Sequence, residues 1–375
     1  MSVNTFSLLD SPSTSSITKN NPNSLTPTIK KYKDMKIAIY GAGSLGVVLG
    51  AYLAKSGLSV DLIHHNPEHV NALNTNGAKV IGTTHFCVPV TALLPEEMTS
   101  GYDFIILLTK QHHNTEIAMD ILPLLKADGV LCTLQNGLPE PELAEIVGET
   151  HLIGGIVSWG ATLQAPGVSE LTSMPHSMSF KIGRINGSVD DKLLALKEIL
   201  ELMCPTSISA NILIIRWNKL LINASCSGLS AVLGCTFGEV IENKLSRQYA
   251  LHIIKECIDI ARASGIDVTK TQDGKMAKMF YFNHYPKYLL TSLLIRLAIK
   301  PHKLLKASML QDLEKGKACE VDYINGIVCA YGKRLHIPTP YNDQIVEIIH
   351  GIENHEYTFN FANLDLLLPV MQLNK

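Results

Sequence analysis

Hydrophobic and polar residues follow each other in different ways along this chain, and the changes divide it into three parts. Residues 1–34 are rich in Ser, Thr, Asn and Pro and show no periodicity, which is typical of a disordered tail. From residue 35 to 205, short apolar runs of strand length alternate with segments of helical period; from 206 to 375 the helical period dominates. We therefore predict a tail, an α/β domain and an all-helical domain.

The α/β part is predicted to be a Rossmann-type, doubly wound parallel sheet. Its short apolar runs are Lys36–Tyr40, Ser59–Ile63, Tyr102–Thr109, Val130–Leu134 and Leu152–Ser158. Continuous apolar runs of this length suit parallel strands that helices cover on both faces. Ligands of such sheets bind outside the carboxyl ends of the strands, so the polar residues that follow these runs are candidate site residues.

In the last part, apolar residues recur at the spacing of packed helices. These helices are predicted over Leu213–Ala231, Ser246–Ser264, Tyr288–Leu297, Val321–Arg334 and Asp343–Ile352. When an α/β domain is followed by a helical one, ligands commonly bind in the cleft between the two.

The turn after the first predicted strand has the spacing G-x-G-x-x-G. It consists of Gly41, Ala42, Gly43, Ser44, Leu45 and Gly46. The first glycine permits a tight turn, the second lets a pyrophosphate approach the backbone, and the third lets the next helix pack on the strand. The helix predicted over Val47–Ser56 would point free N–H groups at the phosphates. A glycine turn that binds nothing is the alternative, but the strand–helix–strand context favours a dinucleotide site.

Composition narrows the classes of function. Of 375 residues, 46% are hydrophobic and 18% charged, with a formal net charge of −2. There is no basic stripe, and the longest apolar run is short and broken by Arg296, so neither a nucleic acid nor a membrane is an expected partner. Eight cysteines without a C-x-x-C pair, and no signal peptide, favour free thiols in the cytoplasm. His65 and His69 lack a third ligand nearby, so we expect solvated loop histidines and no metal.

Two polar clusters in the helical part could carry chemistry. Lys219, Asn223 and Ser227 are spaced by four, so they face one way on a mostly apolar helix. A lysine there is costly to desolvate unless it has a partner, although it could also snorkel to the surface. Further on, Glu320 suits the first turn of a helix, where it could be only a helix-start acid, and Ser308 could be only a cap.

Together these motifs resemble the ketopantoate reductase (2-dehydropantoate 2-reductase) family. The resemblance runs from Met35 to about residue 352. It rests on the glycine loop, Lys110 at a strand end, Gln135-Asn136-Gly137, the Trp-x-Lys-x-x-x-Asn helix, and Ser-Met-Leu-Gln-Asp followed by Glu-x-Asp-Tyr-Ile-Asn-Gly. It implies NADPH-dependent reduction of a branched 2-oxo acid, with ketopantoate as the first expectation.

The resemblance also implies roles for individual residues. Lys219 would be the proton donor. Cofactor contacts outside the glycine loop would come from Lys110, Asn136, Gly160 and Glu320. Substrate contacts would come from Asn136, Asn223, Ser227 and Ser308, with Asp312 as a support of the same cleft.

Departures from the family leave the substrate and the cofactor open. Ser227 stands where members usually have a second helix asparagine, and Phe237 replaces a polar substrate contact that some members have. His64-His65-Asn66 follows the second strand, where members often have an arginine for the 2′-phosphate. The acid of NAD-specific folds is also missing there, because Asp61 lies inside the strand, so NADP is favoured slightly and NAD stays open. Residues 276–303 look long and aromatic-rich for the family, and they could reshape the pocket or an oligomer contact such as that of a homodimer.

Two other functions stay open at this point. One is a reductase of the same fold that acts on a different 2-oxo acid. The other is a dinucleotide-binding regulatory protein without turnover, against which Lys219 and Glu320 argue because a sensor needs neither.

Overall fold

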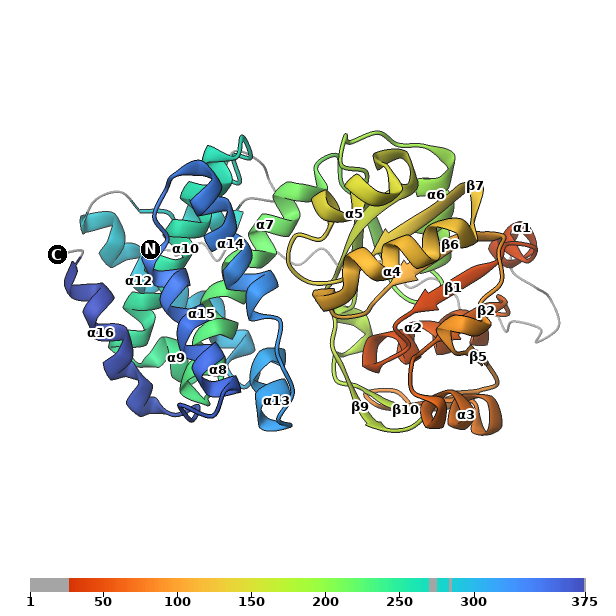
Figure 1. Cartoon of the computed structure of the whole chain (residues 1–375), viewed down its shortest axis with the longest axis horizontal. Helices are drawn as coiled ribbons and strands as arrows, with labels where there is room; N and C mark the ends of the chain where they lie inside the picture. Colours follow the sequence, from red (N-terminus) through yellow and green to blue (C-terminus); the bar gives the residue numbers. More distant parts are fainter. Residues whose placement is uncertain (1–26, 270–274, 283–284, 374–375) are drawn as a thin grey trace, which may run out of the picture.

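The computed structural model describes residues 27–269, 275–282 and 285–373, and it shows two domains side by side (Figure 1). The first contains the strands, and the second is built from helices alone in the part of the chain described. The predicted fold class, a Rossmann-type sheet domain followed by an all-helical domain, is therefore confirmed.

The main sheet has eight strands in the order β12-β11-β8-β7-β6-β1-β2-β5. Their bounds are β1 (Ile37–Tyr40), β2 (Val60–Ile63), β5 (Thr91–Leu93), β6 (Tyr102–Leu107), β7 (Leu125–Thr133), β8 (Leu152–Val157), β11 (Phe180–Gly183) and β12 (Thr206–Ile208). Neighbours are parallel except β8 and β11. The five strands predicted from the sequence are β1, β2, β6, β7 and β8, which adjoin one another in this sheet.

Helices cover both faces of the sheet. They are α2 (Ser44–Lys55), α3 (Pro67–Asn76), α4 (Asn114–Ile121), α5 (Glu140–Val147) and α6 (Asp191–Leu200). Successive residues of β1 point to opposite sides: Ile37 and Ile39 join the apolar cluster around α2 and α6, and Ala38 joins the one around α4 and α5. Burial on both faces explains why these strands read as continuous apolar runs.

A second, four-stranded sheet lies against α2. Its order is β4-β3-β10-β9, with β3 (Ala78–Gly82), β4 (Phe86–Val88), β9 (Ala161–Ala165) and β10 (Val168–Leu171). Because α2 also packs on the main sheet, this helix is held between two sheets, and the position of its first turn is fixed.

Two boundaries differ from the prediction. The end of the expected tail is ordered, because α1 (Pro27–Tyr32) buries Ile29 and Tyr32. The Tyr32 hydroxyl donates to Glu198 of α6 at 2.9 Å. Residues 1–26 lie outside the described part of the chain.

The boundary between the two domains also differs from the prediction. Strand β12 pairs with β11, so the sheet continues past residue 205, and we propose that the domains divide within residues 209–211.

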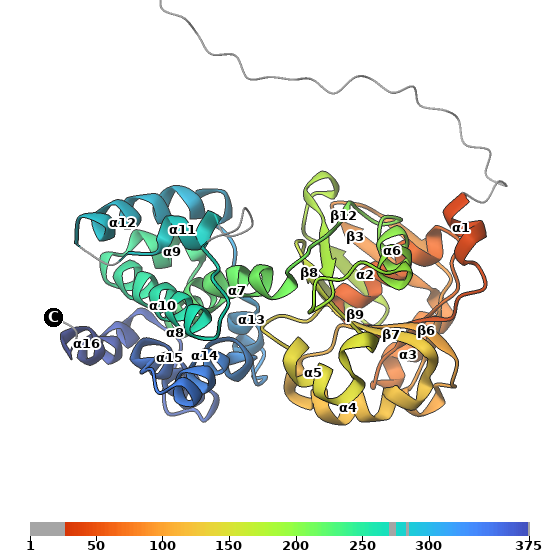
Figure 2. The same cartoon turned by 90° about the horizontal axis from the view of Figure 1, so that it is seen from above.

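The helical domain packs around α10 (Lys244–Ala263). The other helices are α7 (Ile212–Ile222), α8 (Gly228–Leu233), α9 (Phe237–Glu242), α11 (Lys275–Phe280), α12 (Tyr285–Ile299), α13 (Ser308–Glu314), α14 (Val321–Leu335), α15 (Pro340–Glu353) and α16 (Leu364–Leu373). Each predicted helix is present, although the first is divided by a π-helical turn, Asn223–Ser227. Seen from above, α7 bridges toward the sheet domain (Figure 2).

Two global features bear on the earlier expectations. Within the described ranges, no helix has both the length and the apolar character that crossing a bilayer requires. All eight cysteines are free thiols, and seven of them are buried.

Candidate active site

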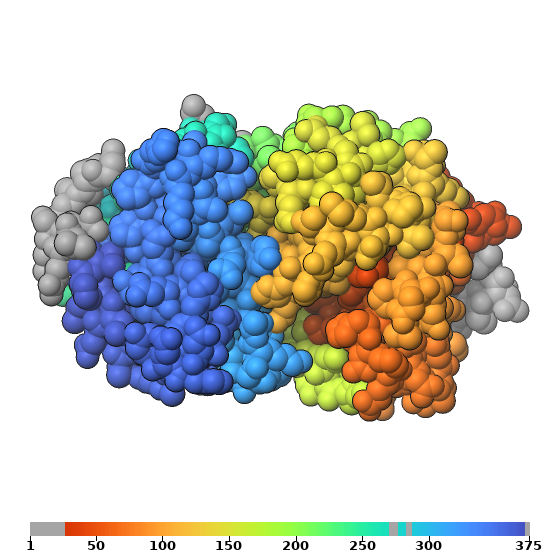
Figure 3. Space-filling view, in the orientation of Figure 1, coloured from red at the N-terminus to blue at the C-terminus, as the bar shows by residue number. Residues whose placement is uncertain are grey.

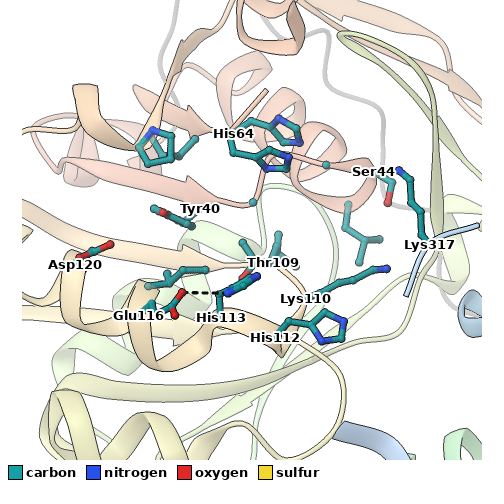
Figure 4. A pocket seen from close by; sticks show the side chains of 18 residues that line it. Tyr40, Ser44, His64, Thr109, Lys110, His112, His113, Glu116, Asp120 and Lys317 are labelled. Atoms are coloured by element: carbon teal, nitrogen blue, oxygen red, sulfur yellow. Dashed lines mark hydrogen bonds and ion pairs between the residues drawn. The ribbon is translucent and has the colours of Figure 1, made fainter. Parts of the chain in front are cut away.

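A cavity of about 720 Å³ opens at the carboxyl ends of β1, β2 and β6. In the space-filling view, the red residues of the glycine loop and α2 lie at the floor of a hollow between the helical domain and the orange part of the sheet domain (Figure 3). Polar side chains from both domains enter the cavity (Figure 4). This is the place where an open α/β sheet binds its ligand.

The glycine loop forms one wall of this cavity. Gly41 has a φ of +100°, and a Cβ on it would lie 2.6 Å from the Thr109 nitrogen, so only glycine fits beside β6. A Cβ on Gly46 would lie 2.4 Å from the Gly41 oxygen, whereas a Cβ on Gly43 would meet nothing within 4 Å. The helix begins at Ser44, three residues earlier than predicted, and no side chain caps its first turn. Its free N–H groups and the open space at Gly43 suit a pyrophosphate.

Lys110 lines the same cavity and connects the two domains. Its Nζ lies 2.9 Å from Asp312 Oδ2 on α13 and donates to the Ala318 oxygen at 3.1 Å. The predicted cofactor residue and the predicted support residue of the cleft are thus an ion pair across the domain boundary.

Glu320 and Asn136 meet behind this pair. Glu320 directly precedes α14, is 9% exposed, and accepts hydrogen bonds from the Asn136 side chain and the Gln111 backbone N–H. Gln111 Nε2 also donates to the Asn136 oxygen at 2.6 Å, which fixes the Asn136 backbone. Burial raises the pKa of Glu320, while the positive charge of Lys110 and the two hydrogen bonds act in the opposite direction.

Lys219 lies in the last turn of α7, at the boundary between the domains. Its Nζ donates to the Val157 oxygen at 3.1 Å, at the carboxyl end of β8. Among the described residues, no carboxylate forms an ion pair with it. Burial, assisted by the charge of Arg216 and opposed by that of Glu320, lowers the pKa of Lys219 to about 8. An amine with that pKa is charged at neutral pH and still gives up its proton readily.

Sequence reasoning missed the role of Arg216, one turn before Lys219. Its guanidinium is buried, pairs with Glu140 of α5 at 2.6 Å, and donates to the Thr133 oxygen at 3.0 Å and to the Gln135 oxygen. Arg216 therefore fixes α7 on the end of β7. No local pattern marks this pair, since the acid lies 76 residues earlier in the chain.

The π-helical turn after Lys219 changes the expected common face. Its i to i+5 hydrogen bonding widens the turn, so residues four apart no longer align. Ser227 is buried, whereas Lys219 and Asn223 are partly exposed. Asn325 Nδ2 donates to the Ala224 oxygen at 3.0 Å, so this asparagine of the Tyr-Ile-Asn-Gly motif holds the turn in place.

Helix α13 packs on the same turn, so Ser308 and Asn223 lie on adjoining segments. Ser308 is the first residue of α13 rather than its cap, because the N-cap position is Ala307. The structure thus brings together the segments that carry the predicted substrate residues.

Outside the glycine loop, Lys110 is a predicted residue that lines the cavity. The other predicted residues do not line it: Asn136, Gly160, Lys219, Asn223, Ser227, Ser308 and Glu320. The N–H of Gly160, between β8 and β9, bonds to Ser173 Oγ at 2.9 Å. Phe237 begins α9 and packs in the core of the helical domain. The described residues of 276–303 do not line it either; α12 packs on α9 and α10 and exposes Leu289, Leu293 and Leu297. The homodimer contact stays a prediction.

The histidines after β2 differ from the expectation. His64 and His65 line the cavity with their rings stacked at 4.6 Å, and burial lowers the pKa of His64 to about 4. His69 is no solvated loop residue: it is buried in α3, with Nε2 2.9 Å from the Ala42 oxygen. Asp61 is confirmed inside β2, where it accepts from the Tyr102 hydroxyl at 2.7 Å. The described residues contain no cluster of three side chains suited to a metal ion.

The sheet order, the glycine loop and the lysine at the domain boundary define a two-domain, Rossmann-type protein with a cleft between its halves. The family described as "Ketopantoate reductase PanE/ApbA" matches residues 37–187, and its partner, "Ketopantoate reductase PanE/ApbA C terminal", matches residues 211–353. The chain belongs to the ketopantoate reductase family, a family of oxidoreductases.

Known relatives are similar along most of their length. A 2-dehydropantoate 2-reductase from Pyrococcus abyssi is 30% identical, and one from Streptococcus pyogenes is 28% identical; each match covers 85% of this chain and 98% of the relative. A structure of D-mandelate dehydrogenase with NADH and anilino(oxo)acetate is 27% identical, with a TM-score of 0.72, covering 86% of this chain and 99% of that one.

Proposed function

We propose that this enzyme reduces 2-dehydropantoate (ketopantoate) to pantoate with a hydride from NADPH, a step of pantothenate biosynthesis. The observation that carries the proposal is the Lys219 ammonium at the end of β8, which is partly desolvated and has no carboxylate partner within the described ranges. The names of the relatives from Pyrococcus abyssi and Streptococcus pyogenes support the substrate.

The bound nicotinamide dinucleotide supplies the hydride. We assign its binding to the backbone of the glycine loop and to four further residues, Lys110, Asn136, Gly160 and Glu320. The free N–H groups at the start of α2 suit the pyrophosphate. Of these four residues, Lys110 lines the cavity, and Glu320 and Asn136 lie behind it. Gly160 is the weakest assignment, because its N–H already donates to Ser173 Oγ.

Lys219 acts on the substrate oxygen. As the hydride adds to the carbonyl carbon, negative charge develops on the oxygen, where an ammonium stabilises it. A proton then passes from Nζ to that oxygen, giving the 2-hydroxy acid and a neutral amine that water reprotonates. General acid assistance of this kind contributes about 10²–10⁴-fold.

The substrate carboxylate requires donors that leave Lys219 free for the carbonyl. We assign this contact to Asn136, Asn223 and Ser308, which lie on segments that meet at the domain boundary. Ser227 is a weaker candidate, since its side chain is buried beside the π-helical turn. Arg216 is unavailable for this role because Glu140 and two carbonyl oxygens occupy its guanidinium.

The direct test is substrate-dependent oxidation of NADPH and of NADH, with ketopantoate first and smaller 2-oxo acids beside it. We expect ketopantoate to give the highest kcat/KM. The preference for NADPH should be small, because the His64 ring is neutral and the acids Glu116 and Asp120 line the same cavity. Equal rates with smaller 2-oxo acids would reject ketopantoate as the substrate.

A second candidate substrate is a different 2-oxo acid. Ser227 and Phe237 replace polar residues of the family, and the similar D-mandelate dehydrogenase structure holds NADH with anilino(oxo)acetate. A panel that includes an aryl 2-oxo acid separates this candidate from ketopantoate by the ratio of kcat/KM values.

The Lys219→Ala variant distinguishes the proposed reductase from a regulatory protein without turnover. We expect kcat to fall by about 10²–10⁴-fold with the Kd for dinucleotide unchanged, since Lys219 acts on the substrate oxygen. The exposed Lys315→Ala variant is the matched control and should keep full turnover. Turnover that survives in Lys219→Ala removes this lysine from the mechanism.

A further inference from the structure

The connection between α13 and α14 forms part of the cavity wall. Lys110 holds this connection through the Ala318 oxygen at 3.1 Å and through Asp312 at 2.9 Å. Lys317, the residue before Ala318, lines the cavity, and of the described residues it is the one lining residue that comes from the helical domain. The helical domain therefore contributes a cation to a cavity that is otherwise built by the sheet domain.

Two other basic side chains of the cavity already have an acidic partner. Lys110 is already neutralised by Asp312, and His113 lies 3.1 Å from Glu116. The His64 ring is neutral at pH 7 because burial lowers its pKa to about 4. The Lys317 ammonium, in contrast, is exposed and makes no ion pair with any residue in the described ranges.

Lys317 lies at the end of the cavity where the glycine loop offers hydrogen-bond donors but no positive charge (Figure 4). Figure 4 shows Lys317 at the same end of the cavity as Ser44, the first residue of α2, and Asp120 at the other end. The loop and the helix start offer only neutral N–H groups. A pyrophosphate diester carries two negative charges, so a cation beside those groups would complete the site.

We propose that Lys317 binds a phosphate oxygen of the dinucleotide pyrophosphate, so that the helical domain completes the cofactor site. The proposal rests on the dinucleotide part of the proposed function and is independent of which 2-oxo acid is reduced. It makes cofactor affinity depend on both domains and on ionic strength.

The test is the Kd of NADPH and NADH, measured by fluorescence titration of the whole chain. Because the contact is charge-assisted but exposed, we expect Lys317→Ala to raise both Kd values about 5- to 20-fold at low salt. Lys317→Arg should restore most of the affinity. Lys315→Ala removes the same charge two residues away, outside the cavity lining, and should change neither Kd by more than about twofold.

Two further readouts separate a pyrophosphate contact from a general loss of structure. ADP-ribose, which keeps the diphosphate, should lose the same factor as NADH, whereas adenosine should lose nothing. The affinity gap between wild type and Lys317→Ala should shrink as salt rises, because salt screens the contact.

Each outcome is decisive. A Lys317→Ala variant that binds both dinucleotides like wild type overturns the inference and leaves the proposed function intact. A weakened variant in an enzyme that reduces no 2-oxo acid supports the inference and rejects the proposed reaction. A wild type that binds no dinucleotide overturns both.

Discussion

In the part of the chain that the structure describes, two ion pairs join the domains, and they differ in burial far more than in length. Arg216 and Glu140 are 2.6 Å apart with side chains 1% and 0% exposed, whereas Lys110 and Asp312 are 2.9 Å apart and 38% and 20% exposed. Removing one partner of a buried pair leaves an uncompensated charge, but an exposed pair contributes little to stability. Burial, not distance, decides which pair holds the domains together.

The comparison indicates that the domain boundary is held more firmly on one side than on the other. Arg216 fixes α7 against α5 and the end of β7, and Lys219 follows it by one turn. The proposed proton donor is therefore held at a constant place relative to the sheet. On the other side, the exposed pair of Lys110 and Asp312 holds the connection that carries Lys317 less firmly, because an exposed ion pair contributes little to stability.

The largest effect on stability is expected from breaking the buried pair. Arg216→Leu leaves the buried Glu140 carboxyl without its partner, so the free energy of unfolding should fall by about 3–5 kcal/mol. Urea denaturation followed by circular dichroism measures this change. The double variant Arg216→Leu with Glu140→Leu is the control, and it should recover part of the loss because no ionisable group remains buried, although the Thr133 and Gln135 oxygens still lack their donor. A single variant that loses less than about 1 kcal/mol would show that the pair does not anchor α7.

A smaller effect of opposite sign is expected at Lys219. The pKa of about 8 in the folded state lies below the 10.5 of a free lysine, so folding is penalised while the amine is charged. Between pH 8 and 10.5 the unfolded chain binds more protons, and wild-type stability should rise with pH. Lys219→Met should therefore raise the free energy of unfolding by about 1 kcal/mol at pH 7, an advantage that disappears above pH 10. Chemical denaturation of wild type and Lys219→Met at pH 7 and at pH 10 measures the stability difference at each pH. A Met variant that is less stable than wild type at pH 7 would contradict the predicted gain.

The smallest effect is expected from the exposed pair. Asp312→Asn keeps the shape of the side chain and removes its charge, so the free energy of unfolding should change by less than about 1 kcal/mol. The difference should vanish in 1 M salt, where exposed charges are screened. A loss as large as that of Arg216→Leu, measured by the same urea titration, would end the distinction between the two sides.

The parts of the fold that the sequence predicted are those set by local pattern. The continuous apolar runs of β1, β2 and β6 indicate burial from the sequence alone. The steric requirements for glycine at Gly41 and Gly46 arise within a single turn. Helix α1 was hidden because two buried side chains stand in an otherwise polar tail. The buried state of His69 depends on the Ala42 oxygen, 27 residues away, which no periodicity reveals.

The site was predicted less completely, for a related reason. Resemblance supplied Lys219, Glu320, Asn136 and Lys110, and the structure brings these four together. The pairing of Arg216 with Glu140 and the π-helical turn depend on distant partners, so neither has a local signature. In the sequence, Lys317 looks like any other surface lysine, and only the fold places it at the cavity.

The central claim is that the Lys219 ammonium delivers the proton, and the pH dependence of single-turnover ketone reduction tests it most directly. With cofactor and substrate saturating, the wild-type rate should be constant below pH 7 and fall tenfold per pH unit above an apparent pKa of about 8, as the amine loses its proton. Lys219→Arg, which does not titrate in this range, should be slower and show no such fall. A wild-type rate that stays flat to pH 10, or the same fall in the Arg variant, would contradict the account.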